Sequence, residues 1–321
     1  MSILVVGSVA LDDVQTPAGR CTRTLGGACS YFATAASLYD RVNMIGVVGT
    51  DFPHEHVEFF SSRNIDLRGL QVMEGDTFFW AGRYGEDLDA ETLDTQLNVF
   101  ADFHPIIPED LRDSEYVFLA NIDPELQIEV LDQIRSPKLV ALDSMNYWIQ
   151  SKREALMRAI SKIDVLLLNQ GEMWLLVPGE PLVRAAQMLL EQGPHALIVK
   201  RGEHGAILMT RGQSLGESVF LAPAYPLDRV VDPTGAGDSF AAGFMGYLAR
   251  HGCLSIEALR RAVVHGAVVA SFTVQDFSVD RLRTLSMQEI EARYDDFRRF
   301  AHFEPLTPVE CRAYQTPCDW S

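Results

Sequence analysis

The sequence has few cysteines, few basic residues and no long apolar run. Its 321 residues include five cysteines, an odd number without a Cys-x-x-Cys pair or a zinc-ligand spacing, so neither a disulfide framework nor a structural metal is expected. The 27 Lys and Arg stand against 44 Asp and Glu, for a formal net charge of −17, which disfavours nucleic-acid and anionic-membrane partners. No stretch is long and apolar enough to span a bilayer, and no basic leader precedes the first strand. These absences predict a soluble, cytoplasmic protein.

The apolar pattern predicts one α/β domain. Hydrophobic residues make up 47% of the chain, enough for a large core, and α/β folds of this length are commonly one domain. Strand-like runs occur at 3–6, 42–48, 116–120, 139–142, 165–168 and 196–200. Helical patterns occur at 28–39, 54–63, 125–134, 153–160 and 182–192. Such alternation predicts a mostly parallel sheet with helices on both faces.

Two segments break this alternation. Residues 12–25 and 71–102 contain turn residues and alternating apolar or aromatic positions without a helical repeat. They predict antiparallel strands that protrude from the main sheet, with an ordinary edge hairpin as the alternative. The end of the chain lacks periodicity, so we expect a domain over 1–300 and a loosely attached tail over 301–321.

A glycine-rich run directly before a helix is the most informative local feature. Residues 232–240 are Asp-Pro-Thr-Gly-Ala-Gly-Asp-Ser-Phe, and apolar residues then recur at helical spacing. The small residues Gly235, Ala236 and Gly237 let an anion approach the unpaired amides and the positive dipole of the helix start. Asp238 is placed to accept a proton from a hydroxyl that attacks a bound phosphoryl group. A simple turn followed by a helix-capping aspartate is the alternative.

The segment 232–245 resembles, position for position, the C-terminal signature of the PfkB family of carbohydrate kinases, the ribokinase-like sugar and nucleoside kinases. Other family elements follow in the expected order over most of the chain. The resemblance implies a ribokinase-like three-layer α/β/α sandwich, in which 12–25 and 71–102 form a small β-sheet lid over the acceptor. It also implies ATP and Mg²⁺, a lid that often serves as a homodimer surface, and room for a monovalent cation such as K⁺.

The predicted acceptor site follows the carboxyl end of the first strand. Open α/β sheets bind ligands there, and Asp12 matches the family aspartate that accepts hydrogen bonds from sugar hydroxyls, with a turn-forming aspartate as the alternative. Gly26 and Gly27 resemble the first family signature and let backbone amides approach a hydroxylated ligand. Tyr31 stands where sugar kinases such as ribokinase carry Asn; its ring would stack on a base, cover a cyclitol or belong to the core. Asn121, after the strand at 116–120, is a further candidate contact.

The resemblance also assigns residues to the nucleotide. Asn169 and Glu172 match the Asn-x-x-Glu motif, which implies Asn169 near the ATP phosphates and Glu172 ordering the waters of Mg²⁺; a helix-capping pair explains the same spacing. The other predicted ATP contacts are Lys200, Gly202, Gly205 and His265. An exposed lysine and a structural histidine are the alternatives for the first and last of these. At Asp143 the family's Asp-x-Asn strand end has one extra residue, so this segment receives no role beyond lining the cleft.

The acceptor is predicted to be uncharged. The chain lacks the Lys and Asn that sugar kinases usually carry after the two glycines, which argues against ribose and phosphosugars. Acidic lid residues supply hydrogen-bond acceptors instead: Glu86, Asp87 and Asp89. Arg83 is the lid residue that would bind a phosphate.

These residues together predict a kinase that transfers the γ-phosphoryl group of ATP to an alcohol of a small uncharged sugar, nucleoside or cyclitol. Asp238 is then the general base, and the amides of residues 235–237 form the anion hole. A vitamin kinase of the same superfamily is one alternative, but it would lack the lid strands. A catalytically silent sugar-binding regulator is another, but it would not need Asp238, Asn169 and Glu172. The chain has neither Gly-x-x-x-x-Gly-Lys-[Ser/Thr] nor the protein-kinase motifs.

Overall fold

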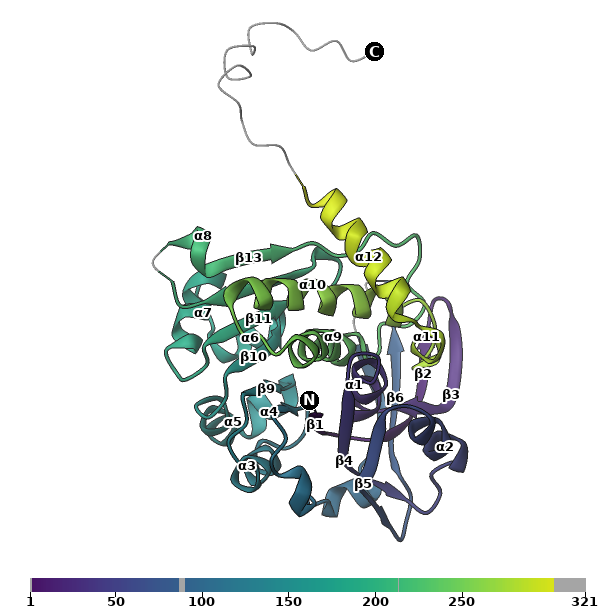
Figure 1. Cartoon of the computed structure of the whole chain (residues 1–321). Helices are drawn as coiled ribbons and strands as arrows, with labels where there is room; N and C mark the ends of the chain where they lie inside the picture. Colours follow the sequence, from purple (N-terminus) through teal and green to yellow (C-terminus); the bar gives the residue numbers. More distant parts are fainter. Residues whose placement is uncertain (1, 87–89, 213, 303–321) are drawn as a thin grey trace, which may run out of the picture.

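The computed structural model describes residues 2–86, 90–212 and 214–302 of the chain (Figure 1). Lid residues Asp87 and Asp89 lie outside these ranges, as does nearly all of the predicted tail, residues 303–321. Within the described ranges, no helix is long and apolar enough to cross a membrane.

Nine strands of the described chain form the main sheet, in the order β13-β12-β11-β10-β9-β8-β1-β4-β5. They are β1 (Ser2–Val6), β4 (Arg41–Gly49), β5 (Ile65–Met73), β8 (Tyr116–Leu119), β9 (Leu139–Asp143), β10 (Val165–Asn169), β11 (Ala196–Lys200), β12 (Ala206–Thr210) and β13 (Val219–Ala222). Neighbours from β5 to β11 pair in parallel, whereas β12 and β13 add antiparallel pairs at one edge. The predicted mostly parallel sheet is confirmed.

Apolar side chains on both faces of the sheet explain the three layers. On β1, Ile3 and Val5 belong to one buried cluster, and Leu4 and Val6 belong to the other. The first cluster is covered by α1 (Ala28–Ala36), α2 (His54–Ser62), α9 (Ala236–His251), α10 (Ile256–Thr273), α11 (Asp280–Thr284) and α12 (Met287–Phe300). The second is covered by α3 (Pro124–Gln133), α4 (Asn146–Ser151), α5 (Arg153–Ile160), α6 (Gln170–Leu176) and α7 (Leu182–Leu190), and the short α8 (Leu215–Ser218) precedes β13. Helix α1 ends at Ala36, three residues earlier than the pattern predicts.

A small second sheet, which we call the lid, has the order β3-β2-β6-β7 (Figure 1). Its strands are β2 (Ala10–Thr16), β3 (Gly19–Gly26), β6 (Phe78–Tyr84) and β7 (Ala90–Gln96). Two pairs are antiparallel as predicted, but β2 and β6 pair in parallel. The all-antiparallel prediction is wrong because β2 follows β1 and β6 follows β5, and β1 and β5 run in the same direction. The predicted lid segment 71–102 also begins too early, since β5 extends to Met73 in the main sheet.

The parallel strands bring polar residues to one edge of the main sheet. Asp143, Asn169 and Lys200 are the last residues of β9, β10 and β11. Asn121 follows β8, and the chain leaves β1 toward Asp12 in the lid. Because the carboxyl ends of parallel strands meet at the same edge, residues from five separate parts of the sequence come to one edge of the sheet.

Candidate active site

The glycine-rich run forms the start of α9, as predicted. Gly235 precedes the helix with a left-handed backbone, φ 73°. A Cβ on Gly235 would also lie 2.2 Å from the ring of Tyr31, so packing and conformation both restrict this position to glycine. No side chain among the described residues caps this helix start. The Ala236 amide donates to the Pro233 carbonyl at 3.2 Å, so the amides of Gly235 and Gly237 are the ones that remain available to an anion within the described structure.

Lys200 brings a cation to this helix start. Its Nζ donates a hydrogen bond of 2.5 Å to Oδ2 of Asp143. A Cβ on Gly237 would lie 3.0 Å from the same Nζ. The ammonium therefore lies directly beside the first turn of α9.

Asp238 has the electrostatics of a general base. Burial raises the pKa of its carboxyl to about 7, Asp143 adds to this rise, and Lys200 opposes it. A group with a pKa near 7 is divided between its two protonation states at neutral pH and suits proton transfer. Asp238 follows Gly237 directly in the first turn of α9, so a proton acceptor lies in the same helix turn as the uncapped amides.

Asp12 is buried on the lid strand β2, at 3% exposure. Its Oδ1 has no hydrogen-bond partner within the described structure. Burial raises the pKa of Asp12 to about 8, with Asp232 and Asp238 adding to the rise. A buried carboxylate oxygen without a donor is costly. The hydroxyl groups of a bound acceptor would satisfy it.

Gly26 and Gly27 support Asp12 from the neighbouring strand β3. A Cβ on Gly26 would lie 1.9 Å from Oδ2 of Asp12, so this glycine makes room for the carboxylate. Gly27 has φ 88°, and its backbone hydrogen bond to Asp12 opposes the rise in the pKa of that carboxyl. The structure thus gives both glycines a role in placing Asp12, in addition to the predicted approach of a ligand.

Asn169 and Glu172 form a reciprocal cap at the start of α6. The Glu172 amide donates to Oδ1 of Asn169 at 2.8 Å, and the Asn169 amide donates to Oε2 of Glu172 at 2.7 Å. Burial raises the pKa of Glu172 to about 7, Asp143 adds to this rise, and Lys200 opposes it. The capping interpretation of this motif is therefore confirmed, and Glu172 also lies within electrostatic reach of the Lys200 ammonium.

The donor set suits Mg²⁺ held mainly by phosphates. No cluster of three metal-ligating side chains occurs in the described ranges. Mg²⁺ in kinase sites keeps several waters and takes few carboxylates, with substrate phosphates as its other ligands. Glu172 is a buried carboxylate at the same edge as Asp238, and both of its oxygens accept hydrogen bonds from Asn169.

Residues 2–283 match the model of the pfkB family carbohydrate kinases. The chain belongs to this family. It is accordingly a kinase of the sugar and nucleoside class. The family resemblance predicted from the glycine-rich run is confirmed, and the match covers nearly the whole described chain.

Known relatives agree with this assignment. The chain is 30% identical to a cytidine kinase of Thermococcus kodakarensis over 251 residues, which span 76% of this chain and 87% of the relative. Its structure is similar to the crystal structure of the Methanocaldococcus jannaschii nucleoside kinase, with TM-score 0.73, 22% identity and coverage of 92% and 98% of the two chains. A putative ribokinase II of E. coli, solved with ATP and Mg²⁺, gives TM-score 0.74 at 20% identity, with coverage of 93% and 99%. The two structures confirm the ribokinase-like fold.

The predicted adenine-stacking role of His265 is wrong. Its ring is stacked between Tyr247, with a centroid separation of 4.5 Å, and Tyr294, at 4.7 Å. Its Nδ1 is hydrogen-bonded to the Tyr39 hydroxyl at 3.1 Å. Burial lowers the pKa of His265 to about 3, so the ring is neutral. With both faces covered, it joins α9, α10, α12 and the segment that follows α1 in the core.

Of the three alternatives for Tyr31, the structure shows the core position and not a ring stacked on an acceptor. The side chain is 1% exposed, and its ring lies against Gly235. Its hydroxyl is buried without a hydrogen-bond partner in the described structure. Burial raises the pKa of Tyr31 well above its ordinary value, and Asp232 and Asp12 add to this rise. Tyr31 therefore packs against the residue that precedes α9, and its hydroxyl is a buried polar group.

The remaining predicted contacts lie at the same edge of the sheet and differ in how much space the structure leaves around them. Gly202 has φ 54° and open space around its Cα, which fits the predicted close approach of a nucleotide. A Cβ on Gly205 would lie 2.1 Å from the Ala222 carbonyl oxygen, so packing alone explains this glycine. Asn121 has a buried Oδ1 without a partner in the described chain, a polar group that a ligand hydroxyl would satisfy.

Sequence reasoning missed two residues of the site. The Thr234 hydroxyl donates to Oη of Tyr84 at 3.0 Å, across 150 residues of sequence. Tyr84 thereby joins the lid to the loop before α9. Asp143, the partner of Lys200, received no role because of the extra residue after it. Its position as the polar last residue of a buried strand was the signal that could have identified it.

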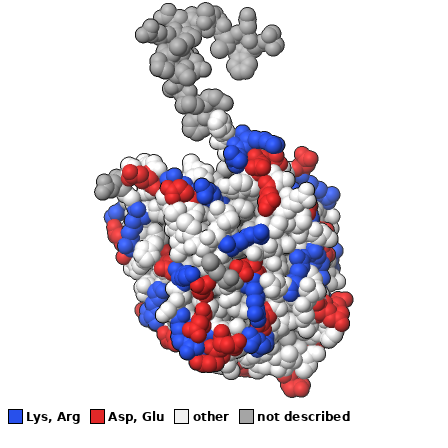
Figure 2. Space-filling model, viewed as in Figure 1, with Lys and Arg blue, Asp and Glu red and all other residues white. Residues whose placement is uncertain are grey.

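Charge is distributed differently on the surface and in the site. Figure 2 shows Lys and Arg interspersed with Asp and Glu over one face of the molecule. In the site, the carboxylates Asp143, Glu172 and Asp238 all raise the pKa of the Lys200 ammonium.

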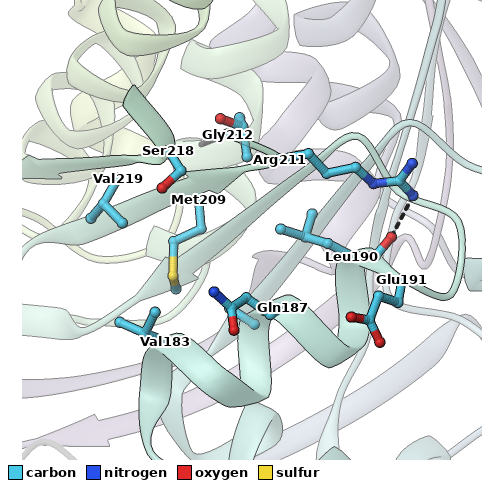
Figure 3. Close-up of a pocket in the computed structure, with 11 residues that line it drawn as sticks. Val183, Gln187, Leu190, Glu191, Met209, Arg211, Gly212, Ser218 and Val219 are labelled. Carbon is cyan, nitrogen blue, oxygen red and sulfur yellow. Dashed lines mark hydrogen bonds between the residues drawn. The ribbon is translucent and has the colours of Figure 1, made fainter. Parts of the chain in front are cut away.

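A cavity of about 340 Å³ between α7 and β12 lies apart from these residues. The Arg211 guanidinium closes one end of the cavity by donating to the Leu190 carbonyl (Figure 3).

Proposed function

We propose that this pfkB kinase transfers the γ-phosphoryl group of ATP to an alcohol of a small, uncharged sugar, nucleoside or cyclitol. The observation that carries the proposal is Asp238, a carboxylate with a pKa near 7 in the first turn of a helix start that no described side chain caps. A proton acceptor and an anion site separated by one residue are what phosphoryl transfer to an alcohol requires.

The proposed chemistry divides among residues of this edge. Asp238 takes the proton of the acceptor hydroxyl while that oxygen bonds to phosphorus and the bond to ADP breaks. The amides of residues 235–237 hold the transferring group, and hydrogen bonds to Asp12 orient the acceptor. Bound Mg²⁺ supplies charge neutralisation to the ATP phosphates. Glu172 and Asn169 would hold its waters and the phosphates.

Charge favours an uncharged acceptor. Asp12 lies near Asp232 and Asp238, and the negative charge that this acidic cluster carries in its ionised forms would repel a phosphosugar. Arg83, the lid residue suited to a phosphate, is half-exposed and already lies 3.6 Å from Glu91. Among uncharged acceptors we place nucleosides first, because the similar Thermococcus kodakarensis protein is a cytidine kinase.

ADP release with Mg²⁺ and ATP tests the proposal directly. The panel comprises cytidine and other nucleosides, pentoses, hexoses, inositols and, as charged controls, fructose 6-phosphate and tagatose 6-phosphate. We expect the highest kcat/KM for an uncharged acceptor. A phosphosugar with the highest value, whose preference disappears in Arg83→Ala, would contradict the acceptor class and make Arg83 the specificity residue. No ADP release with any acceptor would instead support the silent regulator.

Three further expectations belong to this proposal. We expect K⁺ to support more activity than choline, as a monovalent-cation site would require. The exposed β7 edge of the lid is the proposed homodimer surface, which sedimentation of the wild type would test. Truncation after residue 302 should leave activity intact if the kinase domain ends near 300.

A further inference from the structure

Lys200 is an unusual residue to find in this position. Its side chain is 16% exposed and that of Asp143 is 6% exposed, and lysine is rarely buried unless it is paired. Burial acts to lower the pKa of Lys200, but Asp143 and Glu172 raise it above its ordinary value. The side chain therefore stays an ammonium at neutral pH. A buried ion pair commonly stabilises a fold no more than a well-packed apolar pair, so stability alone does not explain this pair.

The ammonium has donors to spare and lies beside the start of α9. A lysine ammonium carries three N–H donors. Within the described chain it donates one hydrogen bond, to Asp143. The same Nζ lies 3.0 Å from the position of a Cβ on Gly237, and an oxygen atom bound at the first turn of α9 would be within its reach.

We propose that Lys200 binds the γ-phosphoryl group during transfer and that Asp143 is a positioning residue that holds the Lys200 ammonium beside Gly237. This inference rests on the proposed function. As the phosphoryl group moves from ADP to the acceptor oxygen, the Lys200 ammonium stabilises the negative charge of that group on one side, and the α9 amides donate to it on the other. Asp143 touches neither nucleotide nor acceptor and acts through Lys200.

Nucleotide binding distinguishes this role from a structural ion pair. The experiment measures Kd for the β,γ-imido analogue of ATP and for ADP, each with Mg²⁺, by calorimetry on the full chain. We expect Lys200→Met to weaken binding of the imido analogue by about tenfold to a hundredfold, the range for a lost hydrogen bond to a charged group. ADP lacks the γ-phosphoryl group, and its Kd should change much less.

Lys152→Met is the matched control. Lys152 donates to two carboxylates, Asp123 and Glu125, at 2.7 Å each, but it lies between α4 and α5 on the face of the sheet opposite α9 and is more exposed. We expect this variant to bind both nucleotides as the wild type does. Equal weakening of ADP and imido-analogue binding in Lys200→Met would contradict a γ-phosphoryl contact, and so would an unchanged Kd for both.

A double variant guards against unfolding. Lys200→Met alone leaves Asp143 buried and unpaired, which is destabilising. The double variant with Asp143→Asn removes both charges, and we expect it to fold and to show the same selective loss as Lys200→Met. Asp143→Asn alone should produce a smaller loss of the same kind. Additive effects of the two substitutions would contradict the claim that Asp143 acts through Lys200.

The outcomes separate this inference from the proposed function. A wild type that binds neither nucleotide and releases no ADP with any acceptor would contradict both. If the wild type turns over an acceptor but the variants keep the native ratio of the two Kd values, the proposed function stands and only the inferred role of Lys200 is contradicted.

Discussion

Helices α6 and α9 both begin at the carboxyl edge of the main sheet, and their first turns differ. In α6, the side chains of Asn169 and Glu172 each accept a hydrogen bond from the other residue's backbone amide. In α9, Gly235 precedes the helix and no side chain of the described residues caps it. A capped start has amides that are already satisfied, whereas an uncapped start leaves them for a ligand. The difference favours α9 as the site of the transferring phosphoryl group and α6 as its support.

Asp238→Asn should cause the largest loss of activity among the variants that test this difference between α9 and α6. The first turn of α9 keeps its amides but loses its proton acceptor, so we expect kcat to fall by about two to four powers of ten. The Kd for MgATP should change little. Steady-state kinetics on the best acceptor and calorimetry measure the two effects.

Asp280→Asn is the control for that variant, because Asp280 lies exposed in the first turn of α11. It should retain wild-type kcat. Near-native turnover in Asp238→Asn would mean that another group is the base.

Gly237→Val tests the uncapped helix start itself. A side chain there would meet the Lys200 ammonium and crowd the amides, so we expect kcat to fall by about a hundredfold or more, as for loss of an oxyanion-hole donor. Gly171→Val, at the matching first turn of α6, would place a Cβ 3.3 Å from Oδ1 of Asn169. This tight contact disturbs the cap, so we expect lower stability but a much smaller loss of kcat than in Gly237→Val. A selective loss of acceptor affinity in Gly237→Val would move the anion site elsewhere.

Asn169→Ala tests the capped helix. Loss of the cap should lower the free energy of unfolding by about 1 kcal/mol, measured by urea denaturation. Asn169→Ser keeps a capping hydroxyl and should restore stability. We expect KM for ATP to rise in both variants, since neither side chain reaches the phosphates. A serine variant with normal stability and normal KM would reduce Asn169 to a cap.

The pH dependence of kcat gives the smallest but most specific effect. Asp238 must be deprotonated to act, and burial raises its pKa to about 7, so the rate should rise with pH through about 7. Asp143 raises this pKa and Lys200 lowers it. The acidic limb should therefore move to higher pH in Lys200→Met and to lower pH in Asp143→Asn. A limb that stays in place in both variants would show that it does not report Asp238.

Features encoded within a few consecutive residues were predictable from the sequence. The α9 start, the α6 cap and the alternating strands and helices all depend on local spacing, which is visible in one chain. The pairing of β2 with β6 was not predictable in this way, because its direction follows from the course of β1 and β5 through the main sheet.

Contacts between distant segments account for the other errors. Tyr31 and His265 stand at positions where the family places ligand contacts, but Gly235 packs on the first and two tyrosines enclose the second. Tyr84 and Asp143 acquire their roles from partners 150 and 57 residues away. The end of a buried strand marks Asp143 as a candidate, but local pattern contains no signal for the partner of either residue, so only the folded structure reveals the two pairs.

A crystal structure with the Mg²⁺-bound imido analogue of ATP tests the central claim most directly. The account predicts the γ-phosphoryl oxygens within about 2.7–3.1 Å of amides at residues 235–237, with the Lys200 ammonium on the same group. A γ-phosphoryl group bound at the start of α6, with the α9 amides facing water, would contradict it.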